Sequence, residues 1–110
     1  MRSRMAVSLV LAALGALPSG VAKAADGAAL YQANCAKCHG PGGKADTAAG
    51  RALKTPSLLD PKLAGADATP QIVQRVRENA KHKQVSASLD DADLAAIAEF
   101  VRTLAAGAGG

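Results

Sequence analysis

The stretch Cys35-Ala36-Lys37-Cys38-His39 decides how the rest of the chain is interpreted. Two cysteines three positions apart lie on one face of a helical turn, so both thiols can reach one edge of a single flat ligand. They can add to the two vinyl groups of a haem, while the imidazole of His39 reaches the iron from the same side. The spacing therefore predicts one covalently attached haem, bonded through Cys35 and Cys38 and with His39 as an iron ligand.

Two cysteines at this spacing also occur in redox dithiols, in disulfides and in zinc sites. A zinc site would need two further ligands, but the chain has no other cysteine and only one other histidine, His82. A dithiol of the thioredoxin kind lies in a βαβ unit, and no strand pattern flanks this motif. Haem attachment is therefore the preferred interpretation.

Residues 1–24 have the pattern of a secretory signal peptide. A positively charged start, Met1-Arg2-Ser3-Arg4, precedes an apolar segment over residues 5–17, and Ala22-Lys23-Ala24 is a small-residue cleavage site. We expect export to the periplasm, a mature chain from Ala25 and no membrane attachment after cleavage. The alternative is an uncleaved anchor, but the apolar segment is short for a membrane span.

Composition limits the mature chain to one small domain, which we expect to be monomeric. Ten basic and nine acidic residues remain after residues 1–24 are removed, so the high isoelectric point is no sign of nucleic-acid binding. Tyr31 and Phe100 are the only aromatic residues. A core with so few large side chains is thin for a domain of this size, and a buried haem would supply the missing apolar bulk.

Residue patterns along the mature chain predict an all-α domain. The first helix is expected from about Gly27 to Cys38, capped by Asp26 and ended by the helix breakers that follow. The second is expected to begin at Thr69-Pro70, with Thr69 as the capping residue, and to end near Asn79 in a left-handed conformation.

A third helix is expected after Asp90, which caps it. Its apolar residues recur at helical spacing and form one stripe: Leu94, Ile97, Val101 and Leu104. We expect a short turn over residues 45–50, a loop over residues 81–88 and a disordered tail over residues 106–110. The prediction is thus three main helices joined by loops.

These features together resemble the class I c-type cytochromes, which are small single-haem electron carriers. The resemblance rests on the residues around the haem motif and on the last helix: Gly27-x-x-x-Tyr31-x-x-x-Cys35-x-x-Cys38-His39-Gly40, and Leu89-Asp90-Asp91-Ala92-Asp93-Leu94 through Phe100-Val101-x-x-Leu104. It implies a small cytochrome c-like fold over residues 25–105, with loops wrapped around one covalently bound haem c.

The resemblance also implies roles for individual residues. The first and last helices would cross at Gly27 and Phe100, with Tyr31 at the same contact. A proline carbonyl after the haem motif, here that of Pro56, would accept a hydrogen bond from the second ring nitrogen of the proximal histidine. The side chain of Leu58 would pack on the haem nearby.

The sixth iron ligand departs from the family pattern, which has a methionine shortly before the last helix. The only methionines are Met1 and Met5, both in the predicted signal peptide. The family position falls on residues 82–83, and His82 is the one histidine available, so we predict His82 as the distal iron ligand. The alternatives are an open sixth position or ligation by a neighbouring side chain, of which a lysine would first have to lose its proton: Lys81, Lys83 or Asn79.

The predicted function is one-electron transfer in the periplasm through a bis-histidine haem iron, with redox proteins as partners. Imidazole donates more strongly to ferric iron than a thioether does, so we expect a low potential. No paired carboxylates, nucleophile–base pair or phosphate loop is present, so we do not expect an enzyme. Two alternatives are a binder or sensor of small ligands with a labile or vacant sixth site, and the electron-entry subunit of a periplasmic oxidoreductase.

Overall fold

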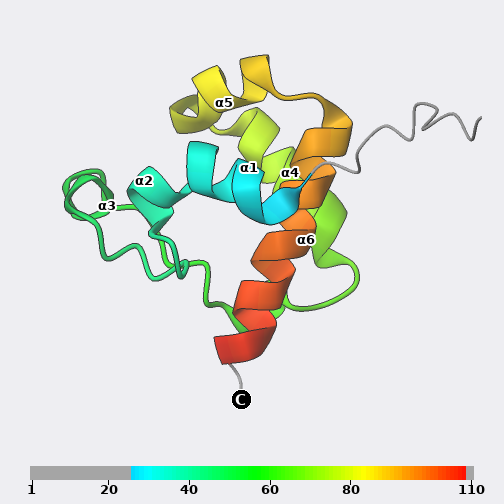
Figure 1. The fold of residues 1–110 in the computed structure, drawn as a ribbon, viewed down its shortest axis with the longest axis horizontal. Coiled ribbons are helices and arrows are strands. Elements are labelled where there is room, and N and C mark those ends of the chain that lie inside the picture. Colours follow the sequence, from blue (N-terminus) through cyan, green and yellow to red (C-terminus); the bar gives the residue numbers. More distant parts are fainter. Residues whose placement is uncertain (1–25, 109–110) are drawn as a thin grey trace, which may run out of the picture.

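The computed structural model describes residues 26–108, and the predicted signal peptide lies outside them. This part of the chain is all-α, as predicted, and contains no strand. In chain order the elements are α1 (Gly27–Asn34), α2 (Ala36–His39), α3 (Ala48–Ala52), the 3₁₀ turn η1 (Pro61–Leu63), α4 (Ala68–Glu78), the 3₁₀ turn η2 (Ala80–His82), α5 (Lys83–Ser88) and α6 (Asp91–Ala108) (Figure 1). None of these helices is long and apolar enough to cross a membrane.

Helix α6 is the element on which α1 and α4 pack. Its apolar stripe supplies most of the core, since five of its residues are buried: Leu94, Ile97, Ala98, Val101 and Ala105. Helix α1 crosses α6 at Gly27, where a Cβ atom would lie 2.1 Å from the carbonyl oxygen of Ala96. Tyr31 and Phe100 meet beside this crossing, with ring centroids 5.0 Å apart. The predicted contact of the first and last helices is therefore confirmed.

Two of the three predicted helix caps are confirmed. The carboxylate of Asp26 accepts a hydrogen bond from the Ala29 amide at 3.2 Å, and that of Asp90 accepts one from the Asp93 amide at 2.8 Å. Thr69 was wrongly predicted as a cap, because α4 begins at Ala68 and Thr69 already lies inside the helix. Its hydroxyl instead donates to the carboxylate of Glu99 on α6 at 2.9 Å, so it bonds to a neighbouring helix rather than to the first turn of α4.

The number of helices and several boundaries differ from the prediction. The predicted first helix is interrupted at Cys35, which has a backbone φ of −118° and separates α1 from α2. Residues 83–88 form α5 rather than a loop, and α3 occupies Ala48–Ala52. Asn79 ends α4 in an extended conformation, not a left-handed one, because its side chain accepts a hydrogen bond from the Lys81 amide. Residues 106–108 belong to α6, and residues 109–110 lie outside the described part.

Candidate haem-binding site

The cysteine–histidine motif begins at the break before α2 and ends with the last residue of that helix. Cys35 and Cys38 are free thiols, both half-buried, and they line the same cavity as His39. Burial raises the pKa of the Cys35 thiol to about 11. Such surroundings disfavour the thiolate on which a redox dithiol depends.

The space beside this motif consists of two adjoining cavities of about 230 Å³ and about 430 Å³. Taken together they have the size of a small-molecule or cofactor site, roughly 300–1,000 Å³. The two cavities share part of their lining, which comes from α2, the loop between α3 and η1, α4 with the residue after it, and η2: His39, Pro56, Leu58, Ile72, Asn79 and His82. Apolar side chains therefore surround a few polar groups that face one another.

His39 is held by the loop that contains Pro56. Its Nδ1 lies 3.1 Å from the carbonyl oxygen of Pro56, which can only accept, so Nδ1 carries the hydrogen and Nε2 is free to bind a metal. Burial lowers the pKa of His39, the bond to Pro56 opposes this effect, and His82 lowers the pKa further. Leu58 lines both cavities, and its amide donates to the Gly43 carbonyl at 2.7 Å, which fixes the loop.

His82 lies at the junction of η2 and α5, directly across the cavity from His39. The two ring centroids are 6.2 Å apart, with an angle of 34° between the ring planes. An imidazole nitrogen binds a transition-metal ion at about 2.0–2.1 Å, so two imidazole rings on opposite sides of one metal ion have centroids about 6 Å apart. The Nδ1 atom of His82 is buried and has no hydrogen-bond partner among residues 26–108. An enclosed atom cannot line the cavity, which leaves Nε2 as the metal-binding nitrogen.

The other candidates for a distal ligand have different environments. The Lys81 ammonium donates to the carbonyl of Leu53 at 3.1 Å, and the Asn79 side chain accepts from the Lys81 amide at 2.9 Å. Lys83 lines neither of the two adjoining cavities beside the haem motif. It lines a separate, shallow cavity beside α4. The bond from Lys81 to Leu53 had no sequence signal, because it joins positions 28 residues apart.

The residues present fit a haem better than a bare metal ion. Within residues 26–108 no group of three or more histidine, cysteine, aspartate or glutamate side chains could hold a metal ion. A porphyrin brings four nitrogen ligands of its own, so its iron needs only axial ligands from the protein. Two thiols on an apolar wall and two opposed imidazoles meet that need.

Residues 22–101 match the family described as cytochrome c oxidase, cbb3-type, subunit III. The chain belongs to this cytochrome c family. The resemblance to single-haem c-type cytochromes is thereby confirmed, and with it covalently bound haem c and electron exchange with redox partners. Cys35 and Cys38 are the only cysteines of this cytochrome, so they are its only possible thioether links. No solved structure matches the chain significantly.

Proposed function

We propose that this cytochrome is a periplasmic one-electron carrier whose haem iron is bound by His39 and His82. The observation that supports the proposal most strongly is the 6.2 Å separation of the two imidazole rings across the cavity. The sequence of residues 1–24 supports export, because it has the three parts of a secretory signal peptide.

The chain's own residues orient and shield the site, and the bound haem supplies the one-electron chemistry. The Pro56 carbonyl holds the ring of His39 in one tautomer and one orientation. Two imidazoles suit both ferric and ferrous iron, so electron transfer requires little movement of the ligands. No described group is arranged for bond-breaking chemistry, and we propose no enzyme activity for this chain alone.

A redox titration of the purified cytochrome, followed by absorption spectroscopy, tests this function. We expect one one-electron transition, low-spin spectra in both oxidation states and a potential below that of His/Met cytochromes, because imidazole stabilises ferric iron better than a thioether does. A potential as high as that of His/Met cytochromes would contradict bis-histidine ligation.

A second candidate function, binding of a small ligand at the iron, is favoured by the buried Nδ1 of His82. A buried donor without an acceptor costs about 1–3 kcal/mol, so the bond of His82 to iron would be the weaker of the two axial bonds. A diatomic gas could then displace it. A reduced spectrum that does not change at once on mixing with carbon monoxide, and shifts only slowly, would favour the carrier, whereas an immediate shift would favour the binder.

A third candidate is suggested by the name of the matched family, which describes an oxidase subunit. The protein would then pass electrons into a periplasmic oxidoreductase rather than act as a free carrier. Co-purification from native membranes separates these possibilities, because a free carrier would be recovered without other subunits.

A further inference from the structure

We propose that Arg77 is a positioning residue for His82, which it does not contact. Its guanidinium fastens α5, the helix that begins immediately after His82, to α4 and to the first turn of α6. This inference rests on the proposed bis-histidine function. It concerns how firmly the distal ligand is held rather than which residue provides it.

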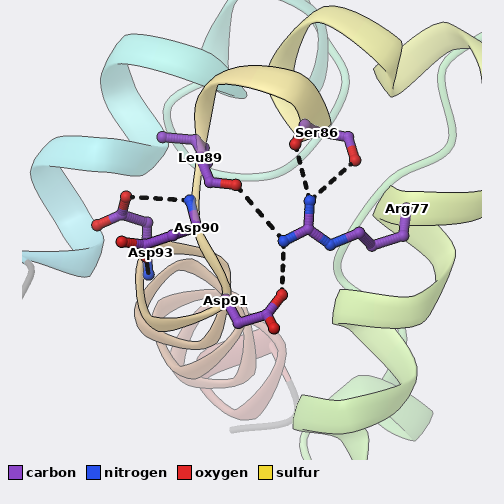
Figure 2. Close-up of polar contacts among 6 residues, drawn as sticks. All are labelled: Arg77, Ser86, Leu89, Asp90, Asp91 and Asp93. Atoms are coloured by element: carbon purple, nitrogen blue, oxygen red, sulfur yellow. Dashed lines mark hydrogen bonds and ion pairs between the residues drawn. The ribbon is translucent and has the colours of Figure 1, made fainter.

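Arg77 lies in the last turn of α4 and bonds to three successive parts of the chain (Figure 2). One guanidinium nitrogen donates to the carbonyl oxygen of Ser86 at 2.7 Å and to its hydroxyl at 3.2 Å. The other donates to the carboxylate of Asp91 at 2.5 Å and makes a longer contact, 3.5 Å, to the carbonyl of Leu89. One side chain thus joins α4, the end of α5 and the start of α6.

Helix α5 depends on such contacts because little else stabilises it. It has six residues, none of them buried. A helix of this length is not stable in water on its own. Its packing is mainly on α4 and on η2, with Val85 and Leu89 only half-buried. The last carbonyls of a helix have no partner within it, and Arg77 donates to one of them, that of Ser86.

The segment that carries His82 is therefore held at two places. On one side of His82, the Lys81 ammonium bonds to the Leu53 carbonyl at 3.1 Å. On the other side, α5 is held by Arg77. Arg77 lines neither of the two cavities between His39 and His82. Any effect of Arg77 on the iron must therefore act through the position of α5.

The bonds to backbone carbonyls matter more than the ion pair. The side chain of Asp91 is 87% exposed, and exposed ion pairs contribute little. A lysine at position 77 would keep the charge but lose the forked geometry that reaches several acceptors at once. We therefore expect Arg77→Lys to hold His82 more firmly than Arg77→Ala does, but less firmly than wild type does.

The rate of carbon monoxide binding to the reduced holoprotein measures how readily His82 leaves the iron. Loss of one or two hydrogen bonds to α5 predicts that Arg77→Ala binds the gas about three- to tenfold faster than wild type. Arg77→Lys should be intermediate, and it serves as the test if the alanine variant does not fold. Hydrogen exchange of the amides in residues 83–89 should rise in parallel.

Arg102→Ala is the matched control. Arg102 bonds to Glu99 at 2.8 Å, and Glu99 accepts from Thr69, so this cluster also joins α4 to α6 but does not touch α5. The control should bind carbon monoxide at the wild-type rate. Equal acceleration in the Arg102 and Arg77 variants would mean general loosening and would overturn the inference.

The inference would also be overturned if both Arg77 variants bound carbon monoxide at the wild-type rate. The same holds if wild type and the two Arg77 variants all failed to bind it. His82→Ala separates this failure from failure of the proposed function. If His82→Ala binds the gas at once while the Arg77 variants behave as wild type, His82 is the ligand and Arg77 does not position it. If His82→Ala matches wild type, the bis-histidine assignment itself is wrong.

Discussion

His39 and His82 differ in what their second ring nitrogen contacts. Nδ1 of His39 donates to the Pro56 carbonyl at 3.1 Å, whereas Nδ1 of His82 is buried without a partner in the part of the chain that the structure describes. His39 also follows directly after Cys38, a thioether link to the haem. The two proposed axial ligands are therefore unequal, and we expect His82 to be the one that an exogenous ligand displaces.

Tyr31 provides a test of a single buried hydrogen bond. Its side chain is fully buried, and its hydroxyl donates to the Gly40 carbonyl at 2.6 Å. Gly40 has φ +79°, where the chain turns away from the haem motif. Tyr31→Phe leaves that carbonyl without its partner, so we expect the free energy of unfolding to fall by about 1–2 kcal/mol in urea denaturation at pH 7.

The same variant should also change the alkaline pH dependence of stability. Burial, with smaller contributions from Cys35 and Asp46, raises the pKa of Tyr31 from 10.0 to about 12. The Tyr31 hydroxyl then holds its proton more tightly in the folded state than in the unfolded state. Its contribution to the free energy of unfolding is therefore complete below pH 10 and is lost as the pH rises to about 12. Tyr31→Phe should lose less stability over this interval, and parallel losses in the two proteins would exclude Tyr31 as the group responsible.

Individual residues could be predicted from sequence where their partners are local. Asp26 and Asp90 cap helices through amides three residues away, and such short-range patterns are visible in a sequence. The hydroxyl of Thr69 bonds instead to Glu99, 30 residues away, and a sequence pattern contains no such information. The sequence does not indicate the roles of Arg77 and Lys81 for the same reason.

The crossing of α1 and α6 leaves no room for a side chain at position 27. A Cβ atom at Gly27 would lie 2.1 Å from the Ala96 carbonyl oxygen and 3.4 Å from the Cβ of Phe100. Gly27→Ala must separate the helices, so we expect a loss of about 3 kcal/mol in the free energy of unfolding. Gly107→Ala in α6 is the control, because nothing lies within 4 Å of its added methyl group.

Chemical denaturation of the two alanine variants decides the point. Gly107→Ala should stay within about 1 kcal/mol of wild type, since alanine favours a helix more than glycine does. Equal stability of the two variants would show that α1 does not approach α6 as closely as the structure places it.

Among the elements, α6 was predictable and α5 was not. The sequence of α6 repeats apolar residues at helical spacing, and the structure buries that face. Residues 83–88 contain one large apolar residue, Val85, so no helical period can be recognised. That segment packs on α4 and bonds to Arg77, and these contacts come from another part of the chain.

Over the whole molecule, the core is as thin as the composition predicts. Nine hydrophobic residues are buried within residues 26–108, and four of them are alanines. The two cavities lie between α2, α4 and the segment around His82, and their lining is largely apolar. The fold class and the haem motif were predictable because both follow from short patterns. The family position predicted His82 opposite His39, but the 6.2 Å separation of the two rings depends on how several elements pack and had no sequence signal.

The central claim, that His39 and His82 are the two axial ligands, is tested most directly by the absorption spectrum of His82→Ala in both oxidation states. Wild type should be low-spin when oxidised and when reduced. His82→Ala should keep its covalent haem but become high-spin when reduced, and it should bind carbon monoxide immediately. A low-spin spectrum of His82→Ala that is identical to wild type in both states would contradict the claim.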